Sequence, residues 1–141
     1  MKFVIVESPF ATNTITLPNG TEHVVEEWGN ILYARACLHD CLVNHGQAPY
    51  ASHLLYTQEG VLDDAVPAER ELGIKAGLEI GRQAELRIFY LDRGFSSGMK
   101  WALKFALEIG QDCEVRRLGD GWGVGWEPDL TLEGMIELVR E

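Results

Sequence analysis

Short apolar runs recur along the chain and predict the strands of a buried sheet. The first run, residues 2–6 (KFVIV), is continuous and rich in β-branched side chains. A run of this kind is typical of a strand that is covered on both faces of a parallel sheet. A comparable run follows at residues 86–91 (LRIFYL), and residues 48–52 (APYAS) and 113–118 (CEVRRL) predict two further strands.

The intervals between these runs carry apolar residues at helical spacing. They predict helices at residues 28–44, 67–82, 97–110 and 130–140. Alternating strands and helices indicate an α/β domain with right-handed crossovers. We therefore expect one domain over residues 1–141, a flavodoxin/Rossmann-like three-layer α/β/α sandwich with a mostly parallel sheet of four to five strands.

Three smaller features depart from this alternation. Residues 14–25 alternate in polarity on either side of a Pro-Asn-Gly turn and predict a hairpin inserted after the first strand. Residues 53–66 have mixed polarity and predict a long loop. The last helix is expected to be capped by Asp129 or Thr131.

Composition narrows the classes of partner. Twelve basic residues stand against 22 acidic ones, a net charge of −10, so nucleic acid is not expected as a partner. Small anions remain compatible, because backbone amides and a few side chains suffice to hold them. No apolar run reaches the length of a membrane span. The three cysteines do not suit a disulfide framework, so a cytoplasmic location is expected.

Functional residues are expected at the carboxyl ends of the predicted strands, where open parallel sheets bind ligands. One of these ends carries Ser96, Ser97 and Gly98 at the start of a helix. Such a turn can hold an anion with its free N–H groups, or it can simply cap the helix through a serine hydroxyl. His53 and Tyr56 follow another strand, and a histidine there either contacts a ligand or is structural.

Acidic and sulfur-containing residues offer weaker candidates. Asp63 and Asp64 suit either a cation or ribose hydroxyls, or the capping of the helix that follows them. Cys37, Cys41 and His45 share one helical face but lack a fourth ligand for zinc, so buried cysteines are the simpler explanation. We expect no metal and no cofactor.

Glycines form a ridge on the predicted helix 67–82. Gly73, Gly77 and Gly81 recur every four residues, and each costs about 1 kcal/mol relative to alanine. The ridge indicates either close packing by a neighbouring element or a ligand lying against the bare backbone.

Taken together, five stretches resemble the nucleoside 2-deoxyribosyltransferase-like superfamily, which includes small nucleotide N-glycosidases. They are VESPF, APYASHLLYTQ, LDDAVPAERELGIKAGLEIG, AELRIFYLDRGFSSGM and the helix ending in EIG. The chain looks most like a branch of short proteins often encoded by bacteriophages. The resemblance implies a homodimer or larger homo-oligomer, in the cytoplasm of a bacterial host.

The resemblance also locates the chemistry that this chain lacks. Active members carry a glutamate nucleophile and an assisting aspartate, which match Ala102 and Gly77 here. Neither residue can attack an anomeric carbon or transfer a proton. The binding half survives, with expected ligand contacts at Ser8, Pro9, Phe10, His53, Tyr56, Asp92, Ser96, Ser97, Gly98 and Met99.

Three functions follow as hypotheses. The first is binding of a nucleotide or nucleotide-derived molecule, for sequestration or sensing, without the usual chemistry. The alternative is a nucleotide N-glycosidase or deoxyribosyltransferase with a relocated carboxylate, for which Asp92, Asp63, Asp64 and Glu7 are candidates. The third is an interaction module that exposes Trp122 and Trp126 to a protein partner.

Overall fold

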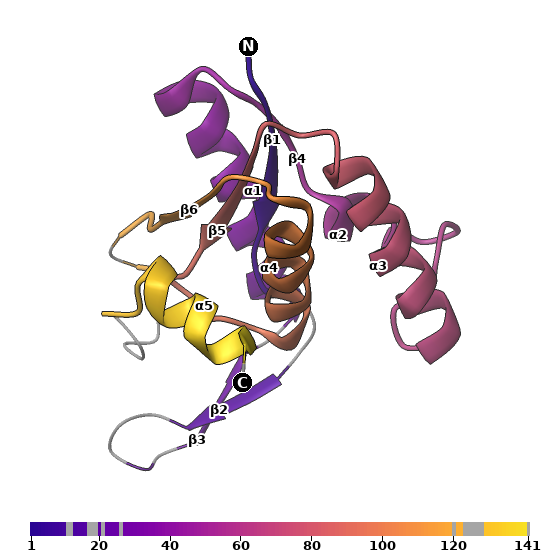
Figure 1. Cartoon of the computed structure of the whole chain (residues 1–141). Helices are drawn as coiled ribbons and strands as arrows, with labels where there is room; N and C mark the ends of the chain where they lie inside the picture. The colour runs from indigo at the N-terminus through magenta and orange to yellow at the C-terminus, as the bar shows by residue number, and fades with distance from the viewer. Residues whose placement is uncertain are drawn as a thin grey trace.

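Four parallel strands form the central sheet, in the order β4-β1-β5-β6 (Figure 1). In the computed structural model the strands are β1 (Phe3–Glu7), β4 (Ala48–Tyr50), β5 (Leu86–Tyr90) and β6 (Cys113–Arg116). The structure describes residues 1–10, 13–16, 20, 22–25, 27–119, 121–122 and 129–140. The predicted α/β fold with a parallel sheet is confirmed, with four strands in this sheet.

Helices cover both faces of the sheet. Helix α1 (Glu27–His45) packs on one face, where Tyr33, Cys37 and Cys41 bury against side chains of β1 and β5. On the other face lie α3 (Pro67–Gly81), α4 (Ser97–Ile109) and α5 (Leu132–Arg140) (Figure 1). None of the helices in the described part of the chain is long and apolar enough to span a membrane.

A separate two-stranded sheet follows β1. Its antiparallel strands are β2 (Asn13–Thr16) and β3 (Glu22–Val25), which project below the main sheet in Figure 1. The predicted hairpin is therefore present, although Pro18 and Asn19 of its turn lie outside the described residues.

The structure corrects one local prediction and decides between the two alternatives of another. The segment predicted as a loop begins with a short helix, α2 (Ser52–Leu55), which starts two residues after the end of β4. Of the two expected caps for α5, Thr131 acts: its hydroxyl accepts a hydrogen bond from the Gly134 N–H at 3.1 Å.

The strand order positions the ligand-binding edge. The chain leaves β1 for β4 on one side and later returns to β5 on the other side of β1. The connections after β1 and β5 therefore run to opposite faces of the sheet, and the loops at their carboxyl ends separate. The cavity described below opens at this point.

Candidate functional site

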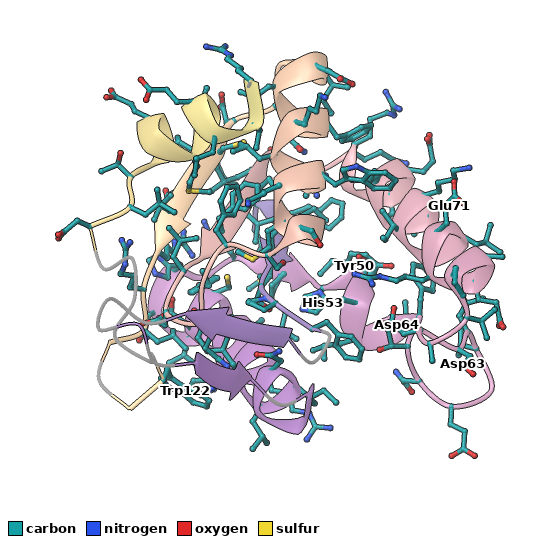
Figure 2. All side chains as sticks on the ribbon, turned by 90° about the horizontal axis from the view of Figure 1, so that it is seen from below. Tyr50, His53, Asp63, Asp64, Glu71 and Trp122 are labelled. Carbon is teal, nitrogen blue, oxygen red and sulfur yellow. The ribbon has the colours of Figure 1, made fainter. Side chains whose placement is uncertain are left out.

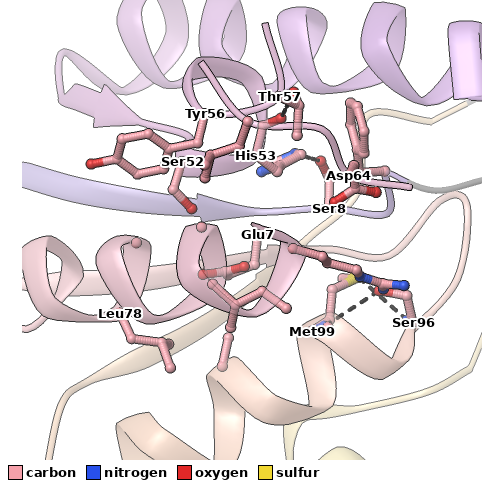
Figure 3. Close-up of a pocket in the computed structure, with 18 of the residues that line it drawn as sticks. Glu7, Ser8, Ser52, His53, Tyr56, Thr57, Asp64, Leu78, Ser96 and Met99 are labelled. Atoms are coloured by element: carbon pink, nitrogen blue, oxygen red, sulfur yellow. Dashed lines mark hydrogen bonds between the residues drawn. The ribbon is translucent and has the colours of Figure 1, made fainter. Parts of the chain in front are cut away.

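A cavity of about 270 Å³ lies at the carboxyl end of β1, between α2, α3 and α4 (Figure 3). Its volume is close to the lower end of the range of small-molecule sites. Side chains and backbone from four regions of the chain form the wall. The lining residues are Glu7, Ser8, Phe10, Ser52, His53, Tyr56, Thr57, Leu62, Asp64, Glu69, Arg70, Gly73, Ile74, Gly77, Leu78, Ser96, Ser97, Gly98, Met99 and Ala102.

The first turn of α4 forms one wall. Ser96 is the N-cap, with φ −74° and ψ 167°, and its hydroxyl accepts a hydrogen bond from the Met99 N–H at 3.3 Å. The N–H groups of Ser97 and Gly98 precede any partner within the helix, as at every helix start. Ser96 therefore caps the helix, as the simpler sequence interpretation held, and the capped turn also lines the cavity.

Ser8 and His53 form the opposite wall, joined by a hydrogen bond (Figure 3). Ser8 Oγ lies 2.9 Å from His53 Nε2, and Ser8 is 6% exposed. Phe10 packs edge-on against the imidazole, with ring centroids 6.1 Å apart. Burial lowers the pKa of His53 to about 4, so the imidazole is neutral at neutral pH.

Glu7, at the end of β1, also lines the cavity, and its side chain lies beside α3 in Figure 3. Its Oε1 accepts a hydrogen bond from Arg87 Nη1 at 2.5 Å, and Arg87 is 1% exposed. Gln111 Oε1 accepts from Arg87 Nε at 2.8 Å. Burial raises the pKa of the Glu7 carboxyl, and the charge of Arg87 opposes that rise. Glu7, in the cavity wall, thus forms a buried ion pair with Arg87, which lies behind the wall, and the sequence did not predict this pair.

Both positions that the resemblance identified as lacking acids line the cavity. Ala102, on α4, is 3% exposed, and Gly77, on α3, is buried. A Cβ atom at Gly77 would lie 2.4 Å from Ser52 Oγ and 2.7 Å from Ser52 Cβ. The backbones of α2 and α3 therefore approach closely there.

The rest of the glycine ridge has a related explanation. A Cβ atom at Gly81 would lie 2.4 Å from Arg87 Nη2, and one at Gly73 would lie 3.1 Å from Leu62 Cδ1. Close packing accounts for the ridge, and Gly73 and Gly77 also face the cavity. The two interpretations of the ridge are thus compatible.

Asp92 and Pro9 are not among the residues that line this cavity. Asp92 Oδ1 accepts hydrogen bonds from the Tyr33 hydroxyl at 2.6 Å and the Leu118 N–H at 2.8 Å. Its Oδ2 accepts from the Gly119 N–H at 3.0 Å. These contacts hold the loop after β6 against α1.

The adjacent acids before α3 divide between two roles. Asp63 Oδ1 accepts from the Ala65 N–H at 2.9 Å and so stabilises the turn before the helix. Asp64 lines the cavity with Glu69 and Arg70, and Figure 2 shows both aspartates beside α3.

Several lining residues were not predicted from the sequence, including Ser52, Thr57, Arg70 and Ile74. One signal could have found two of them. Arg70, Gly73, Ile74 and Gly77 recur at positions i, i+3, i+4 and i+7, so the glycine ridge already marked the face of α3 that meets the cavity.

Two other predictions concern residues away from the cavity. Among the described residues no group of three or more His, Cys, Asp or Glu side chains could hold a metal ion. Trp122 was expected to be exposed, but it is partly buried against the Tyr33 ring, with centroids 5.6 Å apart. Trp122 lies apart from His53 in Figure 2. Trp126 is outside the described residues.

Comparison with protein families gives a match over residues 2–116, to the family described as Domain of unknown function (DUF7768). The chain belongs to the DUF7768 family. The matched segment runs from β1 through β6 and so contains every residue that lines the cavity. A comparison of this DUF7768 chain with curated proteins gave no match.

Among solved structures, the DUF7768 fold is similar to a 2-deoxyribosyltransferase from the psychrotolerant bacterium Bacillus psychrosaccharolyticus. The TM-score is 0.52, and the match covers 82% of this chain and 72% of that chain at 16% sequence identity. The similarity supports the fold that the resemblance implied.

Proposed function

We propose that this protein binds a nucleotide or a nucleotide-derived small molecule in the cavity, without the two-acid chemistry of active deoxyribosyltransferase-like enzymes. The anionic group of the ligand lies on the first turn of α4. One observation carries the proposal: the free N–H groups of Ser97 and Gly98 form the wall of a cavity whose positions 77 and 102 carry no acid. Sequestration or sensing of the ligand is the role that follows.

The composition of the cavity supports a ligand with one anionic end and one flat, less polar part. Leu62, Ile74, Leu78 and Met99 provide apolar surface. The acids Glu7, Asp64 and Glu69 line it too, but Arg87 offsets the charge of Glu7. The similar solved structure is described as a biocatalyst for the synthesis of nucleosides, which agrees with a ligand of this class.

A proline substitution tests the anion site by removing a single backbone N–H group. Ser97→Pro removes the N–H at the first helical position, where proline is tolerated, and the extended φ and ψ of Ser96 suit a residue before proline. Hydrogen bonds to charged groups contribute roughly 1.5–3 kcal/mol, so we expect at least about tenfold weaker binding of nucleoside 5′-monophosphates by calorimetry.

Ser97→Ala is the matched control, because it removes the hydroxyl and keeps the N–H. It should bind monophosphates more tightly than Ser97→Pro does, and the two variants should bind unphosphorylated nucleosides equally. Equal affinity of both variants for monophosphates would contradict the anion site. Absence of binding to any nucleotide tested, with the wild-type chain, would contradict the proposed function.

Glu7 supports a second candidate, N-glycosidic cleavage or deoxyribosyl transfer with a relocated carboxylate. Among the acids that line the cavity, Glu7 alone lies on a strand of the sheet. It shares the cavity wall with Gly77 of α3 and Ala102 of α4. In this reaction the Glu7 carboxylate bonds to the anomeric carbon while the carbon–nitrogen bond breaks and its electron pair leaves with the base. Water or a second base then displaces the carboxylate.

Release of free base from a panel of nucleoside monophosphates tests this candidate. We expect Glu7→Gln to abolish the release, because an amide cannot act as the nucleophile. Asp64→Asn, at the rim of the same cavity, should retain it. Loss of base release in Asp64→Asn but not in Glu7→Gln would indicate that Asp64, at the rim, is the nucleophile instead of Glu7. If the wild-type chain releases no base, this candidate is contradicted and binding is left as the function.

A further inference from the structure

Among the described residues, His53 is the one histidine that lines the cavity, and its imidazole forms a hydrogen bond within the cavity wall. That bond joins Nε2 to Ser8 Oγ at 2.9 Å. The backbone carbonyl of His53 accepts a separate hydrogen bond from the Thr57 hydroxyl, which fixes α2 locally. The position of the ring is therefore set by Ser8 and by the edge of Phe10.

The direction of the Ser8–His53 bond depends on the charge of the imidazole. A neutral imidazole whose Nε2 is the acceptor takes the hydroxyl proton of Ser8. A protonated imidazole donates from both nitrogens, so Ser8 becomes the acceptor and its own hydroxyl proton is free. One proton on His53 thus converts Ser8 into a hydrogen-bond donor directed at the cavity.

Charged and titratable groups on the neighbouring elements line the same cavity as His53. They are Glu7 on β1, held by Arg87; Asp64 before α3; Glu69 and Arg70 on α3; and Tyr56 beside α2. With these groups in place and the cavity without ligand, burial keeps the pKa of His53 at about 4. The acids of the rim are therefore not sufficient to charge the imidazole at neutral pH.

We propose that binding of the ligand's anionic group transfers one proton from solvent to His53, and that Ser8 then donates its hydroxyl proton to the ligand. The proposal rests on the proposed function, because the anion is the one held by the first turn of α4. That turn and the Ser8–His53 pair form opposite walls of the same cavity (Figure 3). An opposite charge within about 4–6 Å favours the protonated imidazole and offsets its burial.

This assignment gives the cavity a preference for anionic ligands over neutral ones of the same shape. The wall contains only Arg70 as a permanent cation. A proton supplied on binding adds a second positive charge without the cost of burying a permanent one in the empty cavity.

Calorimetry with nucleoside 5′-monophosphates, in buffers of different ionisation enthalpy, tests the proton transfer. For the wild-type chain we expect net proton uptake on binding and an affinity that rises by up to about tenfold for each unit of pH lost between about pH 7 and about pH 5. His53→Gln should bind with a smaller slope. The phosphate also titrates near pH 6, but it contributes equally to both proteins, so the difference in slope belongs to His53.

The outcomes separate this inference from the proposed function. Binding with equal pH slopes in the wild-type chain and His53→Gln would overturn the proton transfer and leave nucleotide binding in place. No binding by either protein would overturn both. Ser8→Ala should keep the proton uptake and bind more weakly at low pH, where the wild-type hydroxyl is free to donate.

A second measurement needs no variant. The His53 imidazole of the wild-type chain can be titrated by NMR with and without saturating inorganic phosphate. We expect phosphate to raise the pKa of His53 by about one to three units. An unchanged pKa, with phosphate bound at the cavity, would contradict the inference.

Discussion

Replacing Arg87 with methionine is expected to lower the free energy of unfolding by about 3–5 kcal/mol. Arg87 is 1% exposed, and its guanidinium holds the Glu7 carboxylate at 2.5 Å. Methionine fills a similar volume but leaves Glu7 as a buried carboxylate with no cation beside it. Such a group either stays charged at a high desolvation cost or takes up a proton. Urea denaturation at neutral pH measures the loss.

Arg82 provides a matched control. Its guanidinium lies 5.0 Å from the centroid of the Phe105 ring, and that of Arg87 lies 5.8 Å from the same centroid. The Arg82 side chain is 48% exposed, so Arg82→Met should cost no more than about 1 kcal/mol. The double variant Glu7→Gln with Arg87→Met should be more stable than Arg87→Met alone. Equal losses for Arg82→Met and Arg87→Met would show that the ion pair contributes little.

Acidification should remove up to about 3 kcal/mol of stability through His53 alone. The pKa of His53 is lowered from 6.5 to about 4 in the folded chain. Above about pH 6.5 the imidazole is neutral in both states and contributes no pH dependence. As the pH falls from about 6.5 to about 4, the unfolded chain binds a proton that the folded chain does not, so the folded state loses stability across this window.

The measurement is the free energy of unfolding from about pH 7 to about pH 4, for the wild-type chain and His53→Gln. Glu7 acts in the opposite direction, because its raised pKa lets the folded chain take up a proton first. That contribution is common to both proteins, so the difference between the two curves isolates His53. Parallel curves would show that the imidazole of the folded chain titrates normally.

The two inner strands of the sheet could be predicted from the sequence because each is a local apolar run that is covered on both faces. Residues 2–6 and 86–91 needed no long-range information to be recognised. Helix α2 was missed because four residues are too few to show helical periodicity. Its presence depends on packing against α3, where Gly77 admits Ser52.

The sequence predicted those residues of the site that directly follow a strand. Ser8, His53 and the α4 turn follow strands, and the structure brings them to one cavity. Asp92 also follows a strand, but its carboxylate meets Tyr33 on α1, because consecutive side chains at a strand end can turn to opposite faces of the sheet. Arg87 looked like an ordinary strand residue, and its partner lies 80 positions away in the sequence, so its ion pair with Glu7 had no local signal.

The contact between Gly77 and Ser52 bears on how the chain could change over time. The resemblance matches positions 77 and 102 to the two acids of active members. The two positions differ in how readily each could accept an acidic side chain. Position 102 faces the cavity and needs one substitution. Position 77 would have to lose Ser52 first, because any side chain there meets the serine within 2.4 Å. Installing both acids would therefore take ordered steps, and a laboratory attempt to install them should begin at Ser52.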